Sequence, residues 1–350
     1  MKFGLLHLFE TAGGRSEQQM VKEQIEIMEA AERYNFHSVW TAEHHFSEYG
    51  FCASPALALA AVAQTTSRIR LCSGVVVLPF HHPLRVAEEF AMLDLLSDGR
   101  IELGVGRGYQ PSEFVGYGVD QSRSSELFDE SIEIILKAWS QETFSHHGPH
   151  YRFDNVSVRP RPLQKPRPPI WMAAISDSSF EKAGRYGLNL LCSPVFGGSL
   201  EVARDGIQRY WQALEQHGHD PAQHEIAALC AMYCGETNES ARLEFAEPVT
   251  WYFQHLGKYV APKVGQKSIP GYEGYEGVRD LLSDIQWDQL VTHGAVFCGD
   301  ADYMIEQMQG LREAFGINHV LGWTRVGGLA EHLVEGHMSR MRDKVMPALA

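Results

Sequence analysis

Three ionisable side chains follow directly after one apolar run near the start of the chain. The run SVWTA at residues 38–42 has the composition of a buried strand, and Glu43, His44 and His45 come next. Imidazole titrates near neutral pH, so a histidine at this place can give or take a proton during a reaction. In a barrel of alternating strands and helices, the carboxyl ends of the strands form the active-site face. The residues alone also allow a structural role for both histidines on the barrel rim.

A single arginine between two glycines is a candidate for binding an anion. Arg107 follows the strand pattern at residues 101–105 and lies between Gly106 and Gly108. Small neighbours let a ligand approach the backbone closely, and a guanidinium can bind an oxyanion through two parallel hydrogen bonds. Both properties suit a phosphate group. A salt bridge between neighbouring strand ends is the structural alternative for Arg107.

A serine-rich turn is the second candidate for a phosphate site. It follows the strand pattern at residues 170–174 and opens a helix pattern, with serines at Ser176, Ser178 and Ser179. The first backbone N–H groups of a helix have no partner within the helix, and together with the helix dipole they attract anions. Serine is also common at the start of a helix for purely structural reasons. The turn by itself therefore leaves both roles open.

Strand and helix patterns alternate along the whole chain, which is typical of a parallel sheet connected by helices. We predict eight strands, near residues 3–9, 38–42, 70–77, 101–105, 170–174, 188–192, 226–234 and 319–323. They predict an α/β fold, a closed (β/α)8 TIM barrel that forms a single domain over residues 1–350. Two segments, 108–123 and 257–294, match neither pattern and are expected to be active-site loops or mobile lids.

The composition argues against several classes of partner. The formal net charge is −14 without a basic cluster, so nucleic acid is not expected as a partner. No apolar stretch reaches the roughly 18 residues of a membrane span, and a signal-peptide pattern is missing, so we expect a cytoplasmic protein without membrane contact. The histidine-rich segment at residues 146–150 is expected to be a polar loop that binds no metal, because no cysteine or carboxylate accompanies it. The six scattered cysteines predict reduced thiols.

One helix pattern is more apolar than a barrel helix requires. The stretch ALALAAVA at residues 56–63 is apolar on too many faces for a helix that only rests on a barrel. We therefore expect a homodimer with twofold symmetry, packed through the helices at residues 54–64 and 83–95.

Longer stretches of the sequence resemble the bacterial luciferase-like flavin monooxygenase family. The motif AEHHF at residues 42–46 is similar to a motif of bacterial luciferase. Further segments that resemble this family lie at residues 1–6, 75–94, 97–108 and 343–349. The resemblance covers essentially the whole chain. It implies the TIM barrel of that family and a flavin-dependent reaction.

The resemblance also implies a site for reduced FMN. In this family an arginine like Arg107 and hydroxyl groups at a helix start hold the flavin phosphate. Here the matching hydroxyls are those of Ser176 and Ser179, with Ser178 beside them. The strand end at Gly74 and Val75 is expected to back the flavin ring through an unusual non-proline cis peptide.

Within AEHHF, His44 matches a catalytically important histidine of luciferase, so the resemblance favours a catalytic role for it. His45 is expected to be its structural neighbour, and His45 and Tyr109 are expected to face the substrate or the lid. Two positions depart from the luciferase pattern. Gly106, expected beside the flavin, replaces a reactive cysteine that therefore cannot be needed here, and Ile175 replaces an acidic residue.

The resemblance implies a monooxygenase that takes reduced FMN (FMNH2) from a separate NAD(P)H:flavin reductase and forms a flavin C4a-hydroperoxide with O2. The simplest expected substrate is a small organic aldehyde or ketone. Two alternatives remain at this point. One is an oxidoreductase that transfers hydride with the deazaflavin F420, and the other is a flavin-binding protein without activity.

Overall fold

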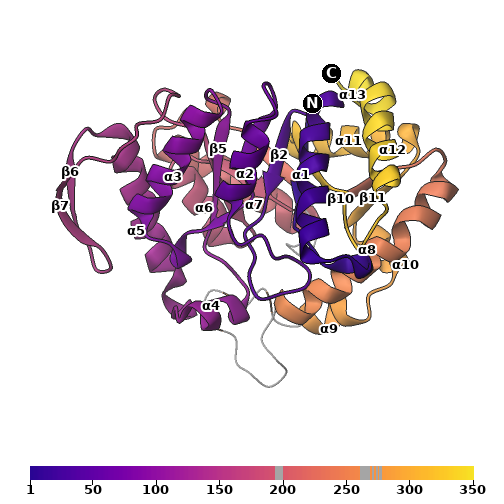
Figure 1. Cartoon of the computed structure of the whole chain (residues 1–350), viewed down its shortest axis with the longest axis horizontal. Coiled ribbons are helices and arrows are strands. Elements are labelled where there is room, and N and C mark those ends of the chain that lie inside the picture. Colours follow the sequence, from indigo (N-terminus) through magenta and orange to yellow (C-terminus); the bar gives the residue numbers. More distant parts are fainter. Residues whose placement is uncertain (194–199, 261–268, 270–271, 273–274, 276–277) are drawn as a thin grey trace.

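Eight parallel strands close into a barrel in the computed structural model, which describes residues 1–193, 200–260, 269, 272, 275 and 278–350 (Figure 1). Each barrel strand is hydrogen-bonded to two neighbours, and the ring is closed by the pairing of the last strand with the first. In order around the ring these strands are β1 (Lys2–His7), β2 (Ser38–Thr41), β3 (Arg70–Ser73), β5 (Ile101–Gly106), β8 (Ile170–Ala174), β9 (Asn189–Cys192), β10 (Ile226–Cys234) and β12 (His319–Trp323). The predicted TIM barrel and its eight strands are confirmed. A short strand, β4 (Val76–Val77), follows β3 and also pairs with β5.

Large side chains fill the barrel interior. The indole rings of Trp40 on β2 and Trp171 on β8 meet edge to face, with centroids 5.3 Å apart, and the His319 ring of β12 packs against both. Hydrogen bonds connect this layer, because the Trp40 Nε1–H donates to Ser38 Oγ, which is also 3.1 Å from His319 Nε2. A packed, hydrogen-bonded interior keeps the strand ends at fixed positions.

The helices cover the outside of the barrel (Figure 1). Their starts follow ordinary capping rules: Ser16 and Gln19 form a reciprocal capping box at the first helix, and Ser54 caps the second, which has Pro55 in its first turn. The longer helices are α1 (Glu17–Arg33), α2 (Pro55–Ala63), α3 (Pro83–Leu96), α5 (Ser124–Ser140), α6 (Asp177–Arg185), α7 (Leu200–Gln216), α8 (Asn238–Val260), α11 (Ala301–Phe315) and α12 (Glu331–Arg340). Among the described residues, none of the helices combines the length and apolarity of a membrane span.

Several elements differ from the predictions. The histidine-rich segment is not a loop throughout, because β6 (Phe144–His147) pairs with β7 (Arg152–Val156) in a hairpin that projects beside α5 at the left of Figure 1. A further strand, β11 (Val296–Gly299), pairs with the carboxyl end of β10.

The two segments predicted to be loops also contain helices. The first holds α4 (Pro111–Tyr117). The second includes the end of α8 and, in its described part, α9 (Val278–Ser283) and α10 (Trp287–Thr292). Residues 261–268, 270–271, 273–274 and 276–277 of this predicted lid lie outside the described residues. A mobile-lid role for either segment stays a prediction.

The two ends of the barrel carry different parts of the chain. Both chain termini lie at the upper end in Figure 1, where the N-terminal ammonium of Met1 donates to the carbonyl oxygen of Leu349, 2.8 Å away. Helices α4 and α9 lie at the lower end. Because α4 follows the carboxyl end of β5, this lower end is the face where barrel enzymes place their active sites.

An exposed apolar surface on α2 and α3 gives the dimer prediction a structural basis. These helices pack side by side, and Leu57 is 75% exposed, Met92 49% and Leu96 46%. We expect a homodimer whose interface covers this surface, because burying apolar area is the main driving force of association. Light scattering at micromolar concentration should give twice the mass of one chain for the wild type. For Leu57→Glu it should give the mass of one chain. Leu243→Glu, at an equally exposed position on α8, is the matched control. A monomeric wild-type mass would contradict this prediction.

Candidate active site

The segment after β2 folds back so that His44 is held from both sides. The backbone N–H of His44 donates to the carbonyl oxygen of Cys52, 3.1 Å away. Gly50 lies directly against the imidazole, and a Cβ at this position would come within 2.9 Å of His44 Cδ2. His44 is buried at the predicted place, the carboxyl end of β2, and its ring has little freedom to turn.

Both ring nitrogens of His44 have hydrogen-bonding partners. On one side, His44 Nδ1 is 3.2 Å from Glu113 Oε1 and 2.8 Å from Gln110 Nε2. On the other side, His44 Nε2 is 3.1 Å from the Tyr49 hydroxyl. Gln110 and Glu113 come from the start of α4, so this short helix completes the surroundings of the histidine.

Two tyrosine hydroxyls continue the chain of contacts from His44. The Tyr49 and Tyr109 hydroxyls are in direct hydrogen-bonding contact. Burial raises the pKa of both phenols well above the ordinary value of 10, so both keep their protons at neutral pH. Further aromatic rings surround the pair: Tyr259 stacks on Tyr49, and Tyr275 stacks on Tyr109. These four tyrosine rings, here called the mouth, surround a polar group made of the two hydroxyls, the His44 imidazole and the side chains of Gln110 and Glu113.

His45 belongs to a second network, centred on the carboxylate of Glu43. His45 Nε2–H donates to Glu43 Oε1 at 2.9 Å, His81 Nε2–H donates to the same oxygen at 2.7 Å, and the Val77 N–H donates to Oε2 at 2.8 Å. Burial alone would raise the pKa of Glu43, but these hydrogen bonds outweigh it and hold the pKa below its usual range. His45 Nδ1 accepts from the Tyr117 hydroxyl at 3.0 Å. The network ties the ends of β2 and β4 to α4.

His45→Ala should therefore lower stability more than turnover. The change removes the imidazole nitrogen that accepts from the Tyr117 hydroxyl and one of the donors to the Glu43 carboxylate. We therefore expect the free energy of unfolding to fall by about 1–3 kcal/mol. Folding lowers the pKa of Glu43, so the ionised Glu43 stabilises the folded state at pH values above its unfolded pKa near 4.5. This stabilisation is lost as the pH falls through the lowered pKa. Urea unfolding at pH 7 measures the loss, with His147→Ala on the exposed hairpin as control. An unchanged unfolding midpoint would contradict it.

The peptide bond between Gly74 and Val75 is cis, as predicted. The Val75 carbonyl oxygen accepts the Glu43 N–H at 3.1 Å, so this strand end lies next to the histidine segment. Gly106 faces Val75 across the sheet, and a Cβ at Gly106 would lie 2.7 Å from Val75 Cγ2. A larger residue, including the cysteine of the luciferase pattern, would push the two strand ends apart.

Arg107 lies at the end of β5 under an aromatic ring. Its guanidinium carbon is 4.3 Å from the centroid of Tyr272. The Tyr272 hydroxyl donates to the Gly108 carbonyl oxygen at 2.9 Å and contacts Ser124 Oγ at the start of α5. Arg107 is also close enough to lower the pKa of Lys182 on α6, although burial is the larger cause. Arg107 thus lies at the end of β5 with its guanidinium against Tyr272, within electrostatic range of α6.

The three serines lie at the start of α6, where the chain leaves β8. Ser179 Oγ completes the helix cap, because it donates to the Ser176 carbonyl oxygen at 2.6 Å and accepts the N–H groups of Ile175 and Ser176. Ser176 Oγ and Ser178 Oγ are 3.2 Å apart and partly accessible. Ser179 thus shapes the turn, and the hydroxyls at its open side are those of Ser176 and Ser178.

Three residues around His44 were not found from the sequence: Tyr49, Gln110 and Glu113. The sequence does carry one signal for the last two. A proline in the first turn followed by an acidic residue is a common helix start, and Pro111 and Glu113 have this arrangement within the segment predicted to be a loop. Tyr49 has no comparable signal.

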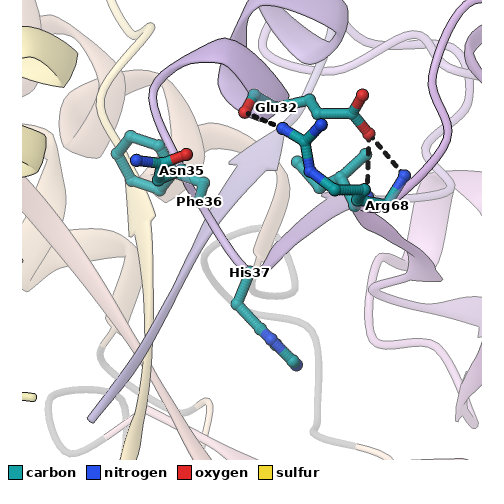
Figure 2. Close-up of a pocket in the computed structure, with 6 residues that line it drawn as sticks. Glu32, Asn35, Phe36, His37 and Arg68 are labelled. Atoms are coloured by element: carbon teal, nitrogen blue, oxygen red, sulfur yellow. Dashed lines mark hydrogen bonds between the residues drawn. The ribbon is translucent and has the colours of Figure 1, made fainter.

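A hollow of about 280 Å³ lies at the opposite end of the barrel (Figure 2). Its wall comes from the end of α1 and from the starts of β2 and β3, at Glu32, Asn35, Phe36, His37, Arg68 and Ile69. The carboxylate of Glu32 already accepts the N–H groups of Arg68 and Ile69 at 2.7 and 2.9 Å. These donors are occupied, so we assign the hollow no part in the site.

Metal and thiol chemistry find little support in the described part of the chain. Those residues contain no group of three histidine, cysteine or acidic side chains placed to hold a metal ion. All six cysteines are unpaired thiols, and only Cys298 is more than marginally accessible. Burial raises the pKa of Cys192 and of Cys298 to about 12, which makes both poor nucleophiles.

The sequence has relatives with named activities. The family model for luciferase-like monooxygenases matches residues 1–319. The oxygenase component of a flavin-dependent trigonelline monooxygenase from Acinetobacter baylyi is 29% identical, over 100% of this chain and 96% of that protein.

Solved structures agree with this relationship. The monooxygenase RslO1 from Streptomyces bottropensis superposes with a TM-score of 0.88 at 28% identity and full coverage of both chains. The FMN complex of the oxygenating constituent of 3,6-diketocamphane monooxygenase from Pseudomonas putida (TM-score 0.81, 20% identity, 99% and 98% coverage) and an F420-dependent secondary alcohol dehydrogenase (0.79, 18%, 100% and 99%) share the fold. With its closed barrel and a family match over most of its length, the chain belongs to the luciferase-like monooxygenases.

Proposed function

We propose that the protein is the oxygenase component of a two-component system and uses reduced FMN and O2 to oxygenate a small organic substrate. The observation that carries this proposal is the order of strand ends around the mouth. The buried His44 follows β2, the cis peptide follows β3, Arg107 follows β5 and the serine turn follows β8. These four strands are consecutive in the ring, so a flavin could extend along them with its phosphate at α6 and its ring toward His44.

The residues present fit this cofactor. Arg107, the first N–H groups of α6 and the hydroxyls of Ser176 and Ser178 would be the donors to its phosphate. Gly106 has no side chain, and Val75 Cγ2 lies beside it, so we propose that the flavin ring lies against these two residues. When bound, reduced FMN would supply the electrons and activate dioxygen, and the protein would supply orientation and exclusion of water.

The chain's own residues define the proton chemistry. His44 lies between the carboxylate of Glu113 and the hydroxyl of Tyr49, so it can hold a proton on either nitrogen. We propose His44 as the catalytic residue, and His45 and Tyr109 as residues at the substrate side of the mouth. An aldehyde or ketone remains the proposed substrate class, and a separate NAD(P)H:flavin reductase is the proposed source of reduced FMN. The relative from Acinetobacter, named an oxygenase component, supports this partner.

The test is turnover coupled to a flavin reductase. A panel of aldehydes and ketones is incubated with the protein, the reductase, NADH and FMN, and mass spectrometry records products that have gained one oxygen atom. F420-dependent hydride transfer is the second candidate, because an F420-dependent dehydrogenase shares the fold. Parallel titrations decide between the cofactors: tight binding of F420 without binding of reduced FMN would overturn the proposal. Binding of reduced FMN without any turnover over a broad panel would favour a flavin-binding protein without activity.

A further inference from the structure

The amide nitrogen of Gln110 contacts two polar groups beside His44, and one of these contacts competes with Glu113 for the same ring nitrogen. Gln110 Nε2 is 2.8 Å from His44 Nδ1 and 2.8 Å from the Tyr49 hydroxyl. Its other terminal atom, Oε1, is buried and has no hydrogen-bond partner within the described part of the chain. The amide thus directs its nitrogen at two polar neighbours and its oxygen at none.

The conflict arises at His44 Nδ1. If Nδ1 carries a hydrogen, it donates to Glu113 Oε1, 3.2 Å away, but it then faces an N–H of Gln110. If Nδ1 carries no hydrogen, it accepts from Gln110, but its lone pair then faces the Glu113 oxygen. That oxygen also accepts the His45 N–H at 2.9 Å, so it is fixed in place. Rotation of the Gln110 amide by half a turn resolves the conflict in favour of a hydrogen on Nδ1.

We propose that Gln110 is a positioning residue that couples the orientation of its amide to the tautomer of His44, and thereby determines whether His44 can accept a proton through Tyr49 and Tyr109. This inference rests on the proposed function, because it assigns the chain of hydroxyls to that reaction. It goes further by naming the residue that controls the proton.

The two amide orientations have different consequences for proton transfer. With the amide nitrogen toward the imidazole, the hydrogen of neutral His44 is on Nε2, which can only donate to the Tyr49 oxygen. With the amide oxygen toward the imidazole, the hydrogen is on Nδ1 and Nε2 is an acceptor. A proton from the mouth can then pass from Tyr109 to Tyr49 and on to Nε2, each hydroxyl giving one proton and taking one. The phenols are suited to this step because both stay protonated at neutral pH.

The first experiment measures the tautomer directly and needs no flavin. The protein is labelled with ¹⁵N in its histidine rings, and the signals of His44 are identified by their loss in His44→Gln. Gln110→Glu has nearly the same shape but presents only oxygens, so we expect the ratio of Nδ1–H to Nε2–H tautomer to rise about tenfold, as for one added hydrogen bond. Gln110→Leu, which removes the N–H donor, should shift the ratio in the same direction. Tyr151→Phe is the control. It removes a hydroxyl that donates to the His81 carbonyl oxygen and should leave the tautomer ratio unchanged.

Identical tautomer ratios in the wild type and in both Gln110 variants would overturn the proposal. The second readout is the fraction of NADH that ends in oxygenated product, measured as a function of pH. Tyr49→Phe and Tyr109→Phe should each lower this fraction at least tenfold. In either variant, adding Gln110→Glu should then leave the fraction unchanged. A tautomer shift together with an absence of products would support the role of Gln110 and count against the proposed oxygenation, so the two failures are distinguishable.

Discussion

His44→Ala should slow product formation by orders of magnitude while flavin oxidation continues. Loss of a positioned acid or base costs about 10²–10⁴ in rate, and the product-forming rate should fall by this amount in the coupled assay. Fold and FMN affinity should remain nearly intact, because the hydrogen-bond partners of His44 lie on α4 and Tyr49, away from the proposed phosphate site. The electrons then leave as hydrogen peroxide, so NADH is consumed with little oxygenated product. Product by mass spectrometry and peroxide by a peroxidase assay together measure this uncoupling.

The control for this variant is a histidine outside the chain of contacts. His147→Ala on the β6–β7 hairpin should keep both the rate and the coupling of the wild type, since this exposed side chain contacts Asp154 and not the site. If His44→Ala instead oxygenates substrate at the wild-type rate and coupling, the catalytic assignment is wrong. The reacting centre would then have to be formed by other residues of the mouth.

Arg107→Ala should weaken the binding of reduced FMN by about 1.5–3 kcal/mol, which is roughly one to two orders of magnitude in Kd. The change removes a charged donor at the end of β5 and leaves the N–H groups of α6 as the remaining phosphate donors. Anaerobic titration with reduced FMN measures the loss. Riboflavin, which lacks the phosphate, should bind the wild type and the variant equally.

Arg107→Lys separates charge from geometry at the same position. An ammonium keeps the charge but lacks the planar fork that binds two phosphate oxygens, so it should restore only part of the affinity. Arg185→Ala at the far end of α6 serves as a control for general loss of positive charge, since this half-exposed residue lies beside Asp129. Unchanged affinity for reduced FMN in Arg107→Ala would show that the phosphate is bound elsewhere.

The barrel could be predicted because each of its strands is an apolar run with its own pattern. The eight predicted runs coincide with the eight strands of the ring, and the positions of His44, Arg107 and the serine turn at strand ends follow from them. The elements that were missed have weaker patterns. Strand β6 alternates between buried and exposed residues over only four positions, and β11 is equally short.

Two of the partners of His44 could not be predicted because they are distant in sequence. Gln110 and Glu113 are 66 and 69 residues away from His44, and they reach it through the pairing of β2, β3 and β5 together with the turn before α4. Sequence patterns report the local environment of a residue and carry little information on such pairings. The resemblance supplied the cis peptide at Gly74–Val75, which no residue pattern indicates.

The cysteines, all buried except the partly accessible Cys298, have a consequence for the durability of a flavin oxygenase. Such an enzyme releases hydrogen peroxide whenever a turnover fails, and peroxide attacks thiolates much faster than thiols. Because burial raises the pKa of Cys192, Cys230 and Cys298 far above neutrality, almost no thiolate is present in the folded protein. Sulfenic acid formation should therefore be slow until the chain unfolds, and oxidative inactivation during uncoupled turnover should follow the unfolding rate rather than the peroxide concentration.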